Sequence, residues 1–186
     1  MADLWSLGKM DRLTLLRLNF AELSELLDMT RSEIASFNDL AAREKDTDFL
    51  RRLKVRVVFS CIEAHVFHLK SAACALSEPG DFSDADKLEL QDLRLAQAGF
   101  QKAKRPLKEN IKLAFRAYGR VCGKSYKVDF SGEEGARFLA AVEIRDRVTH
   151  PKSPRDWRVS ASDHRLVDDA WHWFGKHLVA VSSLDE

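Results

Sequence analysis

Apolar residues recur at three- and four-residue intervals along most of the chain, a spacing that places them on one face of an α-helix. This pattern predicts a helix over residues 13–40, either unbroken or divided near residues 29–30. A second helix is predicted from Thr47 or Asp48, either of which can cap it, to about Leu76. Its middle part is apolar almost all round, which is typical of a helix at the centre of a bundle.

Capping signals divide the second half of the chain into further helices. Ser83 and Asp86 have the spacing of a capping box and predict a shorter helix that runs to about Gln97. Leu93, Ala96 and Phe100 could prolong this helix towards residue 105. Pro106 suits the first turn of another helix, predicted over residues 105–122.

Two more helices are predicted nearer the C-terminus. One begins near Ser131 and runs to Arg145, and the other follows the capping residues Ser160 and Asp163. No strand-like alternation and no internal repeat is visible. The sequence therefore predicts an all-α fold, with residues 1–186 forming a single domain built as a bundle of about five to six helices.

The composition agrees with one globular domain, because 186 residues with 45% apolar and 32% charged side chains can fill one core. Three cysteines, Cys61, Cys74 and Cys122, cannot all pair within the chain, so we interpret them as reduced thiols of a cytoplasmic protein. Residues 1–10 do not resemble a signal peptide, and no apolar stretch is long enough to span a bilayer. Neither export nor membrane insertion is expected.

One group of candidate metal ligands lies in the second helix, where Glu63, His65 and His68 are close in sequence. No second cluster of ligands accompanies them, and His65 falls on the apolar stripe, so a buried core histidine is the preferred interpretation. We therefore expect no metal and no cofactor. Glu63 interrupts an apolar helix and needs a partner of opposite charge, for which Arg145 is a candidate.

Charge is distributed unevenly, although the formal net charge is only +1. Residues 20–50 carry eight acidic and three basic side chains, whereas residues 102–127 carry nine basic side chains and one acidic. Cations recur at strict four-residue spacing along the helix predicted over 105–122 and form a basic ridge: Lys104, Lys108, Lys112, Arg116 and Arg120. This basic ridge is either a solvated helix face or an electrostatic track for RNA phosphates.

Reactive side chains are concentrated in residues 145–152. On a continuous helix Arg145 and His150 would point about 140° apart. Pro151, however, disfavours helical geometry at His150, which is then free to turn back towards Arg145. A guanidinium binds phosphate oxygens, an imidazole moves a proton near neutral pH, and Asp146 could orient either group. These residues are sufficient in kind for RNA cleavage without a metal.

Lys152 and Arg155 follow the motif and extend its positive field. An Arg followed after four to six residues by His, at the end of a bundle helix, is the signature of the HEPN superfamily, and Arg145, Asp146 and His150 resemble it. The position after Arg is commonly Asn in that superfamily and is Asp146 here. The Pro-containing continuation into a capped, Trp-containing last helix also looks like bacterial members of the group.

The resemblance implies a homodimer in which two motifs meet at a cleft. In active HEPN members it implies a metal-independent endoribonuclease that leaves a 2′,3′-cyclic phosphate, with Arg145 holding the phosphate and His150 assisting attack by the 2′-hydroxyl. A second subunit would supply the second proton-transfer group that acid–base cleavage uses. RNA is then the substrate. A further interpretation, beside the nuclease and the non-catalytic module described below, is a toxin paired with a nucleotidyltransferase-type antitoxin protein. The expected RNA-binding residues are Lys152, Arg155, Lys108, Lys112, Arg116 and Arg120.

The alternative is a non-catalytic helical module that binds RNA or another protein. In that case Arg145 forms an ion pair with Glu143 or Asp146, and His150 interacts with the negative end of its helix. The two interpretations differ in the position of the motif histidine. A solvent-filled cleft favours catalysis, and burial in an interface favours the module.

Overall fold

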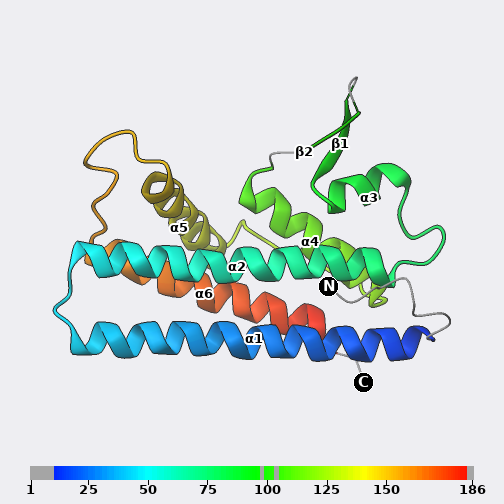
Figure 1. Cartoon of the computed structure of the whole chain (residues 1–186), viewed down its shortest axis with the longest axis horizontal. Coiled ribbons are helices and arrows are strands. Elements are labelled where there is room, and N and C mark those ends of the chain that lie inside the picture. The colour runs from blue at the N-terminus through cyan, green and yellow to red at the C-terminus, as the bar shows by residue number, and fades with distance from the viewer. Residues whose placement is uncertain (1–10, 97–98, 103–104, 184–186) are drawn as a thin grey trace.

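The computed structural model describes residues 11–96, 99–102 and 105–183. Its elements follow in the order α1 (Arg12–Arg43), α2 (Asp48–Leu76), α3 (Asp84–Leu90), β1 (Leu93–Ala96), β2 (Gly99–Lys102), α4 (Leu107–Val121), α5 (Glu133–Thr149) and α6 (Ala161–Ser182). The described residues thus form a bundle of six helices with one small hairpin (Figure 1), which confirms the predicted all-α fold. None of these helices has both the length and the apolar character needed to cross a lipid bilayer.

Helix α2 is the centre of the bundle. It contacts each of the other five described helices, with α1 antiparallel along one side and α4 and α5 on the side away from α1 (Figure 1). Val58, Ile62 and Leu69 of α2 are fully buried. The largest fully buried side chains of the core are Tyr118, Phe59, Phe115, Phe138 and Phe174. The central place predicted from the all-round apolar pattern of α2 is confirmed, because a helix there removes apolar side chains from water on every side.

Helix α1 runs unbroken through the point at which the pattern left a division open. Thr30 is buried, and its hydroxyl donates to the carbonyl oxygens of Leu26 and Leu27, at 3.0 and 3.1 Å. Because this hydroxyl is satisfied by its own helix, it does not divert the backbone. Helix α2 begins as predicted, with the Thr47 side-chain oxygen accepting the N–H of Leu50 at 3.3 Å.

The predicted third helix needs a correction. Its capping box at Ser83 and Asp86 is formed, but α3 ends at Leu90 instead of continuing towards Gln97. Gln97 itself lies outside the described residues. A hairpin, which the pattern did not predict, takes the place of the last helical turns.

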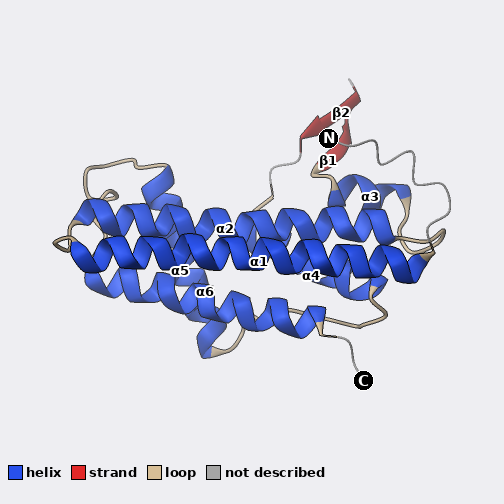
Figure 2. Ribbon diagram, turned by 60° about the horizontal axis from the view of Figure 1, so that its bottom comes forward, coloured by secondary structure: helices blue, strands red, loops and turns tan. Residues whose placement is uncertain are grey.

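The chain leaves α3 through Asp92. This residue has a φ of 55°, a left-handed conformation that ends a helix, and its carboxylate forms an ion pair with Lys70 of α2 at 2.5 Å. Strands β1 and β2 then pair antiparallel, with Leu93 opposite Lys102, and project from the bundle beside α3 (Figure 2). Strands of four residues are too short for their alternation to be recognised in the sequence.

Helices α4 and α6 begin where their capping signals predict, whereas α5 continues one turn beyond its predicted end at Arg145, to Thr149. Helix α4 follows its N-cap residue Pro106 and ends before Gly123, whose φ of 78° glycine adopts without strain. The capping box at Ser160 and Asp163 is formed at the start of α6. The end of α5 and the loop that leads to α6 lie together at one end of the bundle (Figure 1).

Candidate functional site

The motif formed by Arg145, Asp146 and His150 lies at the C-terminal end of α5. Arg145 and Asp146 belong to its last turns, and His150 is the C-cap residue, with φ −127° and ψ 61°. The His150 N–H still donates to the carbonyl oxygen of Asp146 at 2.9 Å, and the Thr149 hydroxyl donates to that of Arg145 at 2.7 Å. The chain leaves the helix at His150, as Pro151 predicts, and His150 is exposed to solvent.

An open depression of about 580 Å³, here called the motif depression, brings these side chains together. Its lining residues are Glu143, Arg145, Asp146, Arg147, His150, Lys152 and Asp156. It contains the three residues expected to be catalytic, Arg145, Asp146 and His150, and also Lys152. Arg155 is exposed on the following loop and is not part of this lining.

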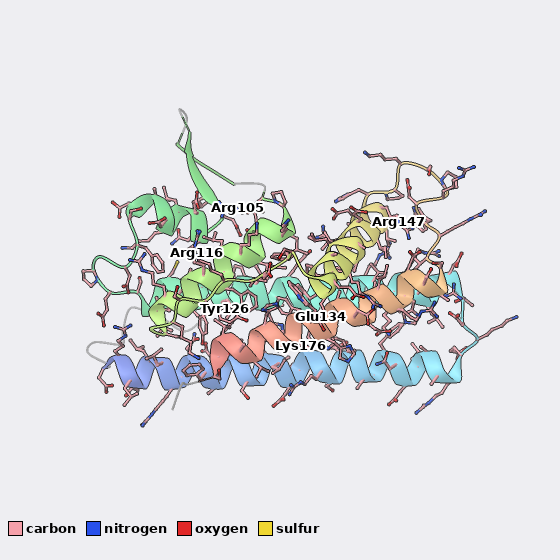
Figure 3. All side chains as sticks on the ribbon, turned by 180° about the vertical axis from the view of Figure 1, so that it is seen from behind. Arg105, Arg116, Tyr126, Glu134, Arg147 and Lys176 are labelled. Carbon is pink, nitrogen blue, oxygen red and sulfur yellow. The ribbon has the colours of Figure 1, made fainter. Side chains whose placement is uncertain are left out.

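One arginine ties the loop after His150 to the helices on either side. Arg147 donates to the carbonyl oxygens of Asp156, at 3.3 Å, and of Arg158, and its guanidinium pairs with Asp163 of α6 at 2.7 Å. Figure 3 shows Arg147 at the end of α5, beside this loop. The side chain therefore fixes the loop that forms one wall of the motif depression.

The same loop is also closed on itself. The Asp156 carboxylate accepts the backbone N–H groups of Lys152 and Ser153, at 2.8 Å each, and these hydrogen bonds hold the pKa of Asp156 below its ordinary value. Arg52 of α2 donates to the carbonyl oxygen of Trp157 at 2.9 Å and lies over its ring. Lys152 is thereby carried by a loop that hydrogen bonds to Asp156 and from Arg52 hold in place.

The Arg145 guanidinium is held by two carboxylates. It donates to Glu63 of α2 and, at 2.8 Å, to Asp146. The partner predicted for Glu63 is confirmed, and so is the ion pair with Asp146 that the non-catalytic interpretation expects. Burial alone would lower the pKa of Arg145, but hydrogen bonds and charge from Asp146 and Glu63 outweigh it and hold that pKa above its ordinary value. The guanidinium stays charged, and its side chain is 25% exposed.

A second depression, of about 270 Å³ and here called the α2–α4 pocket, shares Arg145 with the first. Phe67, Lys70 and Arg105 line it, and none of them was selected from the sequence. Phe67 and Lys70 follow Glu63 by about one and two helical turns, so all three share one face of α2, and this spacing could have found them. Arg105 reaches the pocket only because α4 packs against α2.

The first half of the basic ridge lies over a buried aromatic ring. Lys108 and Lys112 lie over Phe130, with their Nζ atoms 5.4 and 5.9 Å from the ring centre. Lys112 also pairs with Glu109 at 3.1 Å, so this part of the ridge is not free of acidic charge. Lys104, the first cation of the ridge, lies outside the described residues.

The second half of the ridge faces elsewhere. Arg116 and Arg120 are exposed and line a different depression, of about 390 Å³, with two lysines of the following loop. Four-residue spacing turns by about 40° at each step, so the ridge winds around α4 instead of forming one track. Arg116 and Arg147 lie on opposite sides of the molecule in Figure 3, and no described ridge cation lines the motif depression. Contact of the ridge with RNA stays a prediction, separate from the motif.

His65, in the middle of α2, is a core residue. His65 is fully buried, its Nδ1 lies 2.8 Å from the carbonyl oxygen of Cys61, and its ring packs against those of Trp171 and Phe174. Burial lowers the pKa of His65 and of His68. The interpretation of His65 as a core histidine is confirmed. The described residues hold no group of three or more His, Cys, Asp or Glu side chains placed to bind one metal ion.

The cysteines also belong to the scaffold. Cys61, Cys74 and Cys122 are free thiols, as expected. Burial raises the pKa of each, which keeps these thiols protonated and weakly nucleophilic. None of them lines the motif depression, so thiol chemistry is not expected there.

No protein-family model, curated protein or solved structure matches the chain. Its own side chains, and the depressions that they line, are therefore what bears on its function.

Proposed function

We propose that the chain is a cytoplasmic, HEPN-like helical protein that cleaves RNA without a metal ion, with Arg145 and His150 as the catalytic pair. One observation carries the proposal: a guanidinium, an exposed imidazole and the lysine Lys152 line the same open space. A phosphodiester suits this combination, because a planar, permanently charged donor binds its non-bridging oxygens while an imidazole exchanges a proton beside them.

Cleavage would proceed by transesterification within the RNA, in which a 2′-hydroxyl attacks the neighbouring phosphate. His150 accepts the proton of a ribose 2′-hydroxyl, and the 2′-oxygen attacks the neighbouring phosphorus. The bond from phosphorus to the 2′-oxygen forms as the bond to the 5′-oxygen breaks, and the departing oxygen takes up a proton. Arg145 stabilises the negative charge that grows on the phosphate oxygens. The products are a 2′,3′-cyclic phosphate and a 5′-hydroxyl.

Arg145 must exchange one carboxylate for the phosphate. Asp146 lines the motif depression and its side chain is 56% exposed, whereas Glu63 lies outside that lining. We therefore expect the phosphate to replace Asp146, while Glu63 remains bound and orients the guanidinium. In the protein without substrate, the Asp146 carboxylate then occupies the phosphate position and keeps the Arg145 guanidinium in place.

The proposed working state is a homodimer. The reaction uses two proton-transfer groups, and the motif depression holds a single histidine. A second copy that brings its own motif to the same cleft would supply the acid for the departing oxygen. RNA is the proposed substrate, and an antitoxin-like protein that covers the cleft would be the partner that restrains it.

The experiment is incubation of the purified protein with mixed RNA in the presence of EDTA. Wild-type protein is expected to cleave, and His150→Ala to lose about 100-fold or more of the rate, the size of a general acid–base contribution. His172→Ala is the matched control, because His172 is also exposed but lies on α6. Equal rates for the two variants would remove His150 from the mechanism.

A second function, a non-catalytic module that binds RNA or another protein, is favoured by a different observation. Both terminal nitrogens of the Arg145 guanidinium are already paired, and its bond to Glu63 joins α5 to α2 as a structural clamp would. For such a module, no RNA is cleaved in EDTA, and Arg145→Gln lowers the free energy of unfolding. His150→Ala then changes neither stability nor binding.

A further inference from the structure

The surface around the proposed catalytic pair continues into a second space. Arg145 lines both the motif depression and the α2–α4 pocket, so a chain-like ligand that touches its guanidinium can extend from one into the other. At about 270 Å³ the pocket is close to the lower limit of small-ligand sites, roughly 300 Å³. That size suits one nucleotide better than a longer segment.

The α2–α4 pocket combines positive charge with an open aromatic face. Its charged lining residues are three cations, Lys70, Arg105 and Arg145, and two carboxylates, Glu63 and Asp92. Phe67 is 67% exposed, the largest exposed fraction among the large apolar side chains of the described residues. Covering this ring with a flat apolar group would be favourable, because it removes apolar surface from water.

Arg105 is the cation of the pocket best placed to accept a new anion. Its described ionic partner is Glu89, 3.4 Å away, whose side chain is 51% exposed and lies outside the pocket lining. Arg105 itself is 20% exposed, but solvent screens the Glu89 end of the pair, so an anion in the pocket can compete for the guanidinium. Lys70, by contrast, is 3% exposed and closed onto Asp92 at 2.5 Å, so it is part of the pocket wall.

We propose that the α2–α4 pocket is a nucleotide subsite, in which one base of the substrate lies against Phe67 and an adjoining phosphate pairs with Arg105. This inference rests on the proposed function, since it makes the bound nucleotide the neighbour of the phosphate on Arg145. A base stacks on a side chain only when it is unpaired and outside a helical stack. The substrate at this position is therefore single-stranded RNA, and a duplex does not enter the pocket.

Binding is measured by fluorescence anisotropy of a short labelled single-stranded RNA, in a His150→Ala background so that cleavage does not interfere. Phe67→Ala weakens binding about tenfold, as loss of one base–aromatic stack does. Phe49→Ala is the matched control and leaves the affinity unchanged. Phe49 is 62% exposed on the same helix, about 27 Å along its axis from Phe67.

The phosphate contact is tested in the same assay. Arg105→Gln weakens binding and lowers the salt dependence by about one phosphate contact, whereas Arg165→Gln, on the exposed face of α6, changes neither. For a duplex RNA of the same sequence, Phe67→Ala and Phe49→Ala bind equally. Because Phe67 and Phe49 are exposed, both variants are expected to fold, and thermal melting verifies this.

The outcomes separate the subsite from the nuclease. If wild-type protein cleaves RNA through His150 while Phe67→Ala and Phe49→Ala bind equally, the subsite is wrong and the nuclease stands. If no RNA is cleaved but Phe67→Ala alone loses single-stranded RNA, the subsite stands and the nuclease is wrong. Equal loss for single-stranded and duplex RNA overturns the subsite. So does loss of self-association in Phe67→Ala without a change in RNA affinity, which would place Phe67 in a protein interface.

Discussion

His65 lies in the middle of α2 and His150 just past the end of α5, and the two imidazoles meet opposite environments. His65 is fully buried against Trp171 and Phe174, where desolvation lowers its pKa and keeps the ring neutral. His150 is exposed and shares the motif depression with Arg145. The core uses a histidine as a packing group, whereas the helix end leaves one accessible for proton transfer.

Substitution by alanine should affect the stability of the fold strongly at His65 and only weakly at His150. His65→Ala is expected to lower the free energy of unfolding by about 3 kcal/mol, because it leaves a cavity in the core. His150→Ala should change it by no more than about 0.5 kcal/mol. Urea denaturation measures both. Similar losses of stability for the two variants would show that His150 is also structural.

The loop beside His150 should depend on its anchor Arg147, although less strongly than the core depends on His65. Arg147→Ala removes bonds to two carbonyl oxygens and to Asp163, and is expected to lower stability by about 1–2 kcal/mol. RNA cleavage should fall as well, since the loop carries Lys152. Arg137→Ala is the control, because that arginine pairs with Asp169 in a more exposed position on the same helix. An equal effect of the two variants in urea denaturation and cleavage assays would contradict this role.

The pH dependence of stability should distinguish the buried histidine. The pKa of His65 is lower in the folded than in the unfolded protein, so its contribution is complete above the unfolded pKa of about 6.5 and is lost as pH falls towards the folded pKa. In His65→Gln the loss of stability on acidification should be smaller by about 1 kcal/mol per pH unit below that value. Urea denaturation one unit above and one unit below pH about 6.5 measures it.

Part of the acid sensitivity should remain in His65→Gln. Burial also lowers the pKa of His68, His164 and His177. Their contributions to the free energy of unfolding are therefore also lost as pH falls. An unchanged slope in His65→Gln would mean that the pKa of His65 is the same in the folded and the unfolded protein. The remaining histidines would then account for the whole effect.

The smallest expected effect concerns the ion pair that links the core helix to the motif. The Arg145 and Glu63 side chains are 25% and 44% exposed, so solvent screens their attraction. A double-mutant cycle with Glu63→Gln and Arg145→Gln should give a coupling energy of about 0.5 kcal/mol in unfolding. A coupling near zero would show that Glu63 does not hold the guanidinium.

Local signals predicted most of the fold because the interactions concerned span only a few residues. The Thr47 cap and the two capping boxes are formed as their spacing indicates. The end of α3 could not be read in this way. Just after α3 the chain turns away at Asp92, which pairs with Lys70, a residue 22 positions earlier in the chain. That contact exists only once α2 and the chain after α3 are packed together.

The candidate site divides along the same line. Pro151 predicts that His150 leaves its helix, and the unmatched charge of Glu63 predicts its pairing with Arg145. Arg105 was missed because only the packing of α4 on α2 brings it into the α2–α4 pocket. The spacing of the basic ridge predicts one continuous face, because a four-residue repeat hides its rotation around α4, which divides the ridge between two surfaces.

Arg145 and His150 are proposed to act together on one phosphate, and chemical rescue tests this most directly. Cleavage of labelled RNA in EDTA is measured for His150→Ala and Arg145→Ala, with and without free imidazole. Imidazole should restore activity to His150→Ala but not to Arg145→Ala, because it supplies a proton-transfer group and no guanidinium. Full activity of His150→Ala without imidazole, or equal restoration of both variants, would contradict the proposal.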